Sequence, residues 1–268
     1  MKPRIITLLT DFGAQDYFVG AMKGAILSVN PTAQIVDITH EIPPQDIEAG
    51  AFNLLATYKD FPAGTIHVAV VDPGVGSARR PILIECGEQF FVGPDNGIFS
   101  WICEREGSGR AIHLTNGKFF RHPVSATFHG RDVFAPVAAA LARGVAVEDF
   151  GDEASDYVRL DSLLPAVASD GSIDGRVIHI DRFGNCITNL TRENFGEDRA
   201  ASGAKLRING REISSFCNFF SEAAVDGDNL FCIVGSVGFI EIVARNSSAA
   251  TILNARRGDA VTFIPDRQ

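Results

Sequence analysis

Over its first 160 residues the chain alternates short apolar runs with segments in which apolar residues recur every three or four positions. The continuous runs are rich in β-branched residues, which is typical of buried strands, and the three-to-four spacing is that of one helix face. The runs cover residues 5–9, 35–38 and 65–71, and the helical segments cover 19–29, 47–58 and 134–141. Alternation of strand and helix predicts an α/β fold with parallel strand pairs and helices on both faces. We therefore expect residues 1–160 to form a three-layer N-terminal domain around a mostly parallel sheet.

The pattern changes near residue 160. Turn-forming residues with little periodicity fill residues 161–175, which we interpret as a linker. Beyond it the apolar segments are short and strand-like, and they cover 176–180, 206–208, 230–234, 239–243 and 260–264. Asn209-Gly210 is a strong signal for a two-residue hairpin turn. Residues 176–268 are therefore predicted to form a C-terminal domain of antiparallel strands, either a small β-barrel or a sandwich.

Composition narrows the class of protein. Of the 268 residues, 46% are hydrophobic and 21% charged, as in ordinary folded domains. The net charge of −9 argues against a nucleic-acid partner, because such binding needs a basic face. No apolar stretch approaches the ~18–20 residues that span a membrane, so we expect no membrane partner. The five cysteines are widely spaced and odd in number, which favours free thiols in the reducing cytoplasm over a disulfide framework.

Acidic residues follow two of the predicted strands. Asp11 and Asp16 come directly after the first strand, and Asp72 follows the third, shortly before Arg79. Ligands of open α/β sheets bind outside the carboxyl ends of the strands, which is where these carboxylates lie. Capping of a helix or an Asp-Pro-Gly turn is the structural alternative for each of them. Arg79 is placed to orient an anion or one of the carboxylates.

A histidine adds to this group of polar residues. His129 lies in a polar segment, 128–132, just before the alanine-rich helix. A metal hydrolase is one hypothesis, because carboxylate and imidazole suit hydrolytic metals, and its ligands would come from Asp11, Asp16, Asp72, His129 and Asp132. Their spacing matches no tight metal motif such as H-E-x-x-H, so we expect no metal. The loop Gly74-Val75-Gly76 lacks the lysine of a P-loop, so it is a weak phosphate-binding signal.

In the C-terminal domain, polar residues gather where the predicted strands break. Asp181, Phe183 and Asn185 follow the first strand of this domain, and Ser236 and Glu241 flank a later break. Polar atoms on either side of an aromatic ring suit a flat heterocycle. A β-bulge and a turn are the structural alternative.

Motifs along nearly the whole chain resemble one known family. They are Thr10-Asp11-Phe12-Gly13 with Asp16, Val71-Asp72-Pro73-Gly74-Val75-Gly76 with Arg79, Pro94-Asp95-Asn96-Gly97, Phe128-His129-Gly130-Arg131-Asp132, Asp181-Arg182-Phe183-Gly184-Asn185, Gly238-Phe239-Ile240-Glu241-Ile242 and Asn246-Ser247-Ser248-Ala249. In this order they are similar to the S-adenosyl-L-methionine (SAM) hydroxide adenosyltransferases. These are adenosine-forming SAM hydrolases, related to the fluorinases and chlorinases.

The resemblance implies a homotrimer whose active sites lie between the N-terminal domain of one subunit and the C-terminal domain of its neighbour. The implied reaction is attack of water or hydroxide on C5′ of the ribose, which displaces methionine and leaves adenosine. SAM is then the substrate, and no cofactor is expected. The family's catalytic Asp-Arg-His set matches Asp72, Arg79 and His129. Its substrate-binding positions match Asp11 for the ribose with Asp16 in the same loop, Asp181, Asn185 and Ser236 for the methionine part, and Phe183, Glu241 and Val243 on the adenine side.

Two other functions stay open beside hydrolysis: halide-dependent adenosyl transfer and non-catalytic nucleoside binding. Halide-using relatives carry Tyr or a similar neutral residue where this chain has Asp72, and some insert a loop for which residues 84–93 leave no room. A carboxylate beside the nucleophile repels fluoride or chloride, so hydrolysis is preferred. An intact set of Asp72, Arg79 and His129 argues against a protein that only binds a nucleoside. Val237 departs from the pattern, because some relatives hold the methionine carboxylate with an Arg there.

Overall fold

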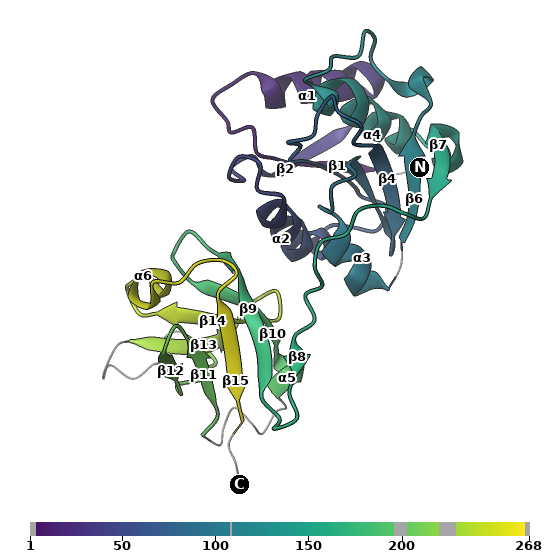
Figure 1. Cartoon of the computed structure of the whole chain (residues 1–268). Coiled ribbons are helices and arrows are strands. Elements are labelled where there is room, and N and C mark those ends of the chain that lie inside the picture. Colours follow the sequence, from purple (N-terminus) through teal and green to yellow (C-terminus); the bar gives the residue numbers. More distant parts are fainter. Residues whose placement is uncertain (1–3, 108, 196–202, 220–228, 266–268) are drawn as a thin grey trace. The chain divides into compact units, whose positions relative to one another are not determined.

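The computed structural model describes residues 4–107, 109–195, 203–219 and 229–265. The chain divides into two compact units, Met1–Ser162 and Leu163–Gln268, and each has its own hydrophobic core. The first unit is a sheet covered by helices and the second consists mostly of strands (Figure 1), which confirms the expected fold classes. No helix within the described ranges is long and apolar enough to cross a membrane.

In the first unit, strands and helices follow the predicted order up to β3. The elements are β1 (Ile5–Thr10), α1 (Phe18–Val29), β2 (Gln34–Thr39), α2 (Ile47–Thr57), β3 (Ile66–Val70), β4 (Pro81–Cys86), β5 (Gln89–Pro94), α3 (Ser100–Glu106), β6 (Gly109–Leu114), α4 (Ala135–Ala142) and β7 (Gly151–Ala154). Short 3₁₀ turns occupy Tyr58–Asp60, Gly117–Phe119 and Val147–Phe150, and a π-helical turn, η3 (Gly130–Phe134), leads into α4. The helix expected over 134–141 is thus α4, and β4, β5, α3, β6 and β7 are additions to the expected elements.

The strands of this unit form one seven-stranded sheet in the order β2-β1-β3-β5-β4-β6-β7. β1 pairs in parallel with β2 and β3, and β3 pairs in parallel with β5, as expected. β4 pairs antiparallel with β5 and β6, and β6 with β7, so the sheet is mixed rather than mostly parallel. The cause is local: only Gly87 and Glu88 connect β4 to β5, and so short a connection joins antiparallel strands.

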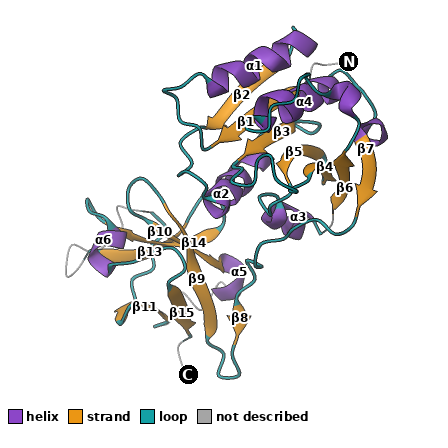
Figure 2. Ribbon diagram, turned by 45° about the horizontal axis from the view of Figure 1, so that its top comes forward, coloured by secondary structure: helices purple, strands orange, loops and turns teal. Residues whose placement is uncertain are grey.

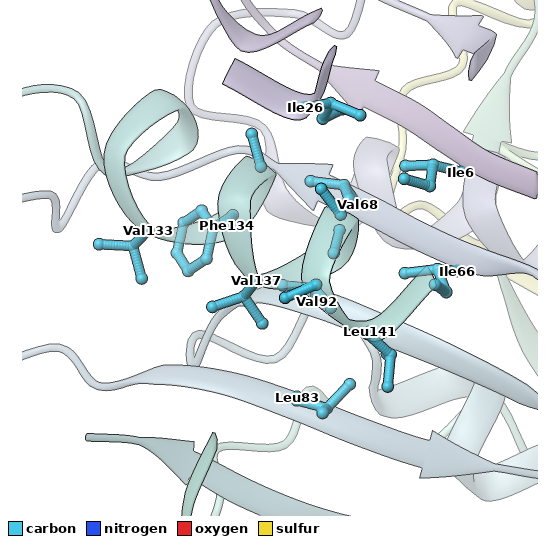
Figure 3. Close-up of a cluster of buried hydrophobic side chains, with 14 of the residues drawn as sticks. Ile6, Ile26, Ile66, Val68, Leu83, Val92, Val133, Phe134, Val137 and Leu141 are labelled. Atoms are coloured by element: carbon cyan, nitrogen blue, oxygen red, sulfur yellow. The ribbon is translucent and has the colours of Figure 1, made fainter. Parts of the chain in front are cut away.

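Helices cover both faces of the sheet, α1 and α4 on one and α2 and α3 on the other (Figure 2). α1 buries Val19, Met22, Ala25 and Ile26, which is the face that the three-to-four spacing predicts. Figure 3 shows the core between this face, α4 and the sheet, with Phe134 among its aliphatic side chains. This packing fixes the carboxyl ends of β1 and β3 beside one another.

The second unit is an antiparallel, nearly closed barrel. Its elements are β8 (Ala166–Val167), β9 (Ile173–Ile180), β10 (Cys186–Thr191), α5 (Arg192–Phe195), β11 (Lys205–Ile208), β12 (Arg211–Ile213), β13 (Leu230–Val234), β14 (Phe239–Ala244), α6 (Ala249–Leu253) and β15 (Ala260–Ile264). The sheet runs β12-β11-β15-β9-β10-β14-β13, and β8 pairs with β9, so part of the segment 161–175 is strand. The main-chain N of Cys232 in β13 donates to the main-chain oxygen of Ser215, and the main-chain N of Cys217 donates to that of Cys232, which brings the two ends of the sheet together.

Asn209 and Gly210 form the predicted turn between β11 and β12. Their φ angles are +48° and +76°, which is the left-handed backbone that a tight two-residue hairpin turn requires.

Candidate active site

The loop after β3 is folded so that its acidic residue stays near the sheet. β3 is buried along its whole length, and the chain turns at Asp72, whose main-chain oxygen accepts a hydrogen bond from Val75 N at 3.2 Å. Gly76 has a φ of +76°, and a Cβ there would lie 2.3 Å from the main-chain oxygen of Ala126. Only glycine permits this approach, which holds the loop against the segment that leads to His129.

Asp72, Arg79 and His129 form one connected cluster. Arg79 donates from Nε to Asp72 Oδ1 at 3.0 Å and from Nη2 to Asp72 Oδ2. Arg79 Nη2 also contacts His129 Nδ1 at 3.1 Å, and the guanidinium carbon lies 5.4 Å from the centre of the Phe134 ring. The side chains of Arg79 and Asp72 are only 7% and 5% exposed, so the ion pair is largely shielded from water. Arg79 Nη1 is buried and has no hydrogen-bond partner within the described ranges.

This geometry assigns the proton of His129. A guanidinium only donates, so His129 Nδ1 accepts the bond from Arg79 and the neutral ring carries its proton on Nε2. Burial and the positive charge of Arg79 lower the pKa of His129, which favours this neutral form. His129 is therefore a neutral partner that fixes the guanidinium plane of Arg79.

Asp11 reaches the same edge of the sheet as Asp72. β1 and β3 are parallel neighbours with Thr10 beside Val70, so the two acidic residues that follow leave the sheet together. Burial raises the pKa of Asp72, the charge and hydrogen bonds of Arg79 oppose this, and the nearby charge of Asp11 adds to the rise. The pair of carboxylates expected from the sequence is thus assembled in the structure, with a guanidinium beside it.

The Asp11 loop is held by residues that follow β2. Thr10 Oγ1 and His40 Nδ1 are 2.9 Å apart, and the Gly13 main-chain N donates to the main-chain oxygen of His40 at 2.8 Å. Gln45 has a φ of +66° and its main-chain N donates to Asp11 Oδ2 at 2.8 Å. One face of the Asp11 carboxylate is therefore fixed by main chain.

Other polar residues of the first unit lie outside this cluster. Asp16 is exposed. Arg80 pairs with Asp95 at 2.7 Å, and the fully buried Asp132 pairs with Arg131 at 2.7 Å, so both have structural partners. Across the part of the chain that the structure describes, no three His, Cys, Asp or Glu side chains converge as metal ligands would.

The second unit presents a tight polar turn between β9 and β10. Asp181 Oδ1 accepts from the main-chain N of Phe183 at 2.9 Å and of Asn185 at 2.8 Å, and its Oδ2 accepts from Asn185 Nδ2 at 2.8 Å. Asn185 is buried by this network, whereas the Phe183 ring is 78% exposed. Burial raises the pKa of Glu241 on β14, and the nearby charge of Asp181 adds to the effect. Asp181, Asn185 and Glu241 are thus brought together, with an exposed aromatic ring beside them.

Two other residues expected to contact the substrate, Ser236 and Val243, differ from one another in exposure. Ser236 is exposed, in the turn between β13 and β14. Val243 is fully buried and packs against Phe231 and Ile233 in a small apolar cluster. Its side chain supports β14 two residues beyond Glu241.

Sequence reasoning missed His40, Gln45 and Phe134 as neighbours of the site. His40 comes directly after β2, which pairs in parallel with β1, so its position at a strand end was a usable signal. Gln45 acts through its main-chain N and a left-handed φ, and nothing in its side-chain type predicts that. Phe134 was expected to begin a helix, but it closes a π-helical turn, and periodicity does not predict its contact with Arg79.

Comparison with known proteins gives a consistent result for both units. The family model "SAM hydroxide adenosyltransferase N-terminal domain" matches residues 6–151, and the model of the C-terminal domain matches residues 175–262. An (R)-S-adenosyl-L-methionine hydrolase from Methanocaldococcus jannaschii is 38% identical over 97% of this chain and 95% of its own length. A fluorinase from an Actinoplanes species is more distant, at 27% identity over 96% of both chains.

A solved structure supports the same relationship. A conserved protein of uncharacterised function from Thermotoga maritima superposes with a TM-score of 0.89 at 34% identity, covering 97% of this chain and 99% of its own. Since the two family models together cover most of the sequence, the chain belongs to the SAM hydroxide adenosyltransferase family.

Proposed function

We propose that this protein hydrolyses SAM to adenosine and L-methionine by attack of water on C5′ of the ribose. The observation that carries the proposal is the buried cluster of Asp72, Arg79 and His129, in which Arg79 Nη1 lacks a partner within the described ranges. A buried donor of this kind is costly unless a ligand oxygen meets it. The guanidinium that carries it is paired with the Asp72 carboxylate, so a water bound by Arg79 lies in a site that also contains a proton acceptor. The Methanocaldococcus jannaschii relative is named for hydrolysis of (R)-SAM.

The substrate makes the departure of methionine easy and the attack difficult. A sulfonium is a charged leaving group that becomes neutral on displacement, so neither a metal nor an acid is needed to expel it. Water is a weak nucleophile, so the site must raise its reactivity. In our mechanism Asp72 accepts a proton from the attacking water while Arg79 Nη1 donates to the water oxygen. The C5′–S bond breaks as the C5′–O bond forms, and the electron pair leaves on methionine sulfur.

His129 acts in this mechanism through Arg79. Its Nδ1 is occupied by the bond from Arg79 Nη2, so that nitrogen is not free to take the proton. The proton therefore goes to Asp72, whose pKa is raised by burial. We assign Asp11 to the ribose hydroxyls, because main chain already fixes one of its carboxylate oxygens. Asp16, exposed in the same loop, is assigned to the substrate entrance.

The second unit supplies the remaining substrate contacts in our proposal. Asp181, Asn185 and Ser236 hold the methionine part, Phe183 and Glu241 form the adenine side, and the buried Val243 supports the strand behind Glu241. The exposed Phe183 ring supports this assignment, because it offers a flat aromatic face on which an adenine ring can stack. We propose that the partners are the substrate and a neighbouring subunit, within a homotrimer with interfacial sites. The free cysteines fit a reducing cytoplasm.

The central test is direct. Purified protein is incubated with SAM in ¹⁸O-labelled water, with chelator present, and the products are separated by chromatography and mass spectrometry. We expect adenosine that carries the label on its 5′-oxygen, together with methionine, and a preference for the (R) over the (S) sulfonium epimer. Absence of adenosine, or adenosine without label, would contradict the proposal. A major 5′-chloro-5′-deoxyadenosine product at high chloride would support halide transfer instead.

The subunit arrangement has its own test. His129→Ala changes the first unit and Asn185→Ala changes the second, and each is expected to inactivate the protein. We propose that each site combines the first unit of one subunit with the second unit of its neighbour. In a mixed trimer, some sites then pair the intact first unit of an Asn185→Ala subunit with the intact second unit of a His129→Ala subunit. These sites should restore part of the activity. Mass spectrometry of the intact assembly verifies the exchange. No recovery after verified exchange would place each site within one subunit.

A further inference from the structure

Two buried cysteines of the first unit touch one another. Cys86 is the last residue of β4 and Cys103 lies in α3, and their thiols form a hydrogen bond. Cys86 pairs across the sheet with Gly109 of β6. A Cβ at position 109 would lie 3.4 Å from both Cys103 Sγ and Cys86 Cβ, so the glycine leaves room beside the two cysteines.

Hydrogen-bond donors and a positive charge surround Cys103. Besides the Cys86 thiol, the Tyr157 hydroxyl forms a hydrogen bond with Cys103, and Tyr157 in turn accepts from Arg159 Nη2 at 3.3 Å. The Arg159 guanidinium carbon lies 4.8 Å from the centre of the Tyr157 ring. The bond from Cys86 is the main cause that lowers the pKa of Cys103, while the same bond raises that of Cys86. Burial raises the pKa of Tyr157 to about 12, so its hydroxyl remains a donor at neutral pH.

A cavity gives small molecules access to this group. Its volume is about 330 Å³, and its lining includes Cys103, Tyr157, Arg159, Glu104 and Ser162. Cys86 is not among the lining residues, so Cys103 is the thiol of the pair that a reagent in the cavity meets first. The acidic Glu104 accepts a hydrogen bond from Ser162.

We propose that Cys103 and Cys86 form a peroxide-reactive dithiol site, with Cys103 as the attacking thiolate and Cys86 as the resolving thiol. Redox-sensing sites combine a cysteine of lowered pKa that a reagent can reach with a second thiol beside it, and here the cavity is the route by which a small oxidant reaches the buried Cys103. The Cys103 thiolate attacks hydrogen peroxide, the O–O bond breaks, and the sulfenic acid and hydroxide form. The Cys86 sulfur then attacks the sulfenic sulfur, and the S–S bond forms as water leaves with the Cys86 proton. A thiol reductant returns both residues to the starting state.

Wild-type protein is treated with limiting hydrogen peroxide, quenched by alkylation, digested without reductant and mapped by mass spectrometry. We expect a Cys86–Cys103 disulfide that dithiothreitol reverses, while Cys217 stays alkylated although it is the more exposed thiol. Oxidation of Cys217 before the pair, or no oxidation of the pair, would overturn the proposal. Neither result depends on SAM hydrolysis, so this test stands apart from the proposed function.

Two variants assign the roles within the pair. In Cys86→Ser, dimedone should trap a sulfenic acid on Cys103, and a trap elsewhere or none in a folded variant would refute the assignment. Arg159→Gln should slow disulfide formation at least about threefold, because the rate follows the thiolate fraction. Arg143→Gln is the matched control, since Arg143 contacts the main-chain oxygen of Val29 and lies outside the cavity lining. Equal rates for the two Arg variants would remove Arg159 from the site.

Discussion

Replacing Asp72 by Asn separates the catalytic from the structural role of this carboxylate. The variant keeps the size of the side chain and removes its charge, so Arg79 loses an ionic partner that now receives two of its hydrogen bonds. Because the two side chains are 5% and 7% exposed, water cannot replace that partner efficiently. Breaking a buried ion pair from one side typically costs about 3–5 kcal/mol of stability. At about 2–4 °C per kcal/mol, the melting temperature of the first unit should fall by roughly 6–20 °C.

The activity of Asp72→Asn should fall for a separate reason, the loss of a general base. This loss should persist in a variant whose stability is restored. Removal of a general base costs about 10²–10⁴-fold in rate. The double variant Asp72→Asn/Arg79→Gln leaves no unpaired charge, so it should regain much of the melting temperature while staying inactive. The assays are thermal unfolding by circular dichroism and adenosine release under saturating SAM. Arg79→Gln alone completes the double-mutant cycle and measures the coupling between the two residues.

Three results would contradict parts of this reasoning. If Asp72→Asn keeps more than about a tenth of the wild-type turnover, Asp72 is not the proton acceptor. If the double variant regains both stability and activity, the pair serves only to hold the loop. An equally low melting temperature for the single and double variants would mean that the cost arises from packing rather than from an unpaired charge.

Three further predictions concern other residues of the two units. Burial lowers the pKa of His67 to about 4, so the unfolded chain binds its proton first and the free energy of unfolding should fall by roughly 3 kcal/mol between about pH 6.5 and 4. Urea unfolding at both pH values checks this, and His67→Gln should remove that part of the pH dependence. His40→Leu and Thr10→Val each remove the bond that holds the Asp11 loop, and each should raise KM for SAM about fivefold with a smaller change in kcat; steady-state kinetics with unchanged KM would contradict this. Asp181→Ala removes an acceptor of three hydrogen bonds and should destabilise the second unit by roughly 2–4 kcal/mol. Asp181→Asn keeps an acceptor oxygen and should cost clearly less in the same thermal melts.

The order of elements in the first unit could be predicted because its helices and strands differ in period. α1 and α2 bury one face each, and β1 and β3 are continuous apolar runs. The direction of β4 could not be obtained that way, since periodicity does not distinguish parallel from antiparallel neighbours. The two-residue connection over Gly87 and Glu88 decides the direction, and it is visible only once the strand ends are known.

The candidate site shows a similar division. Asp11 and Asp72 could be placed together because parallel strands end at one edge, and the structure brings them together with Arg79 and His129. The hydrogen bond between Arg79 and His129, which assigns the proton of His129, depends on how the two side chains are oriented, and their positions in the sequence do not predict it. The contact of Gln45 with Asp11 is made by main chain, which no side-chain motif encodes. The sequence therefore predicted which residues of the first unit meet, but not how their side chains and main-chain groups are oriented.

The charges around Asp72 bear on which nucleophile the site selects. With His129 neutral, two carboxylates face one guanidinium, so a cluster of Asp11, Asp72 and Arg79 carries a net negative charge that complements a sulfonium substrate. Water gains positive charge on its oxygen as it attacks C5′, and a carboxylate at that position stabilises the change. A halide must enter as an anion, and a like charge at ~4 Å costs about 4 kcal/mol near a protein surface, which is roughly thousandfold in rate. The same carboxylate that accepts the proton of water therefore excludes chloride. For this reason Asp72→Ala, which removes the charge and opens space, is the variant in which chloride incorporation should first become measurable.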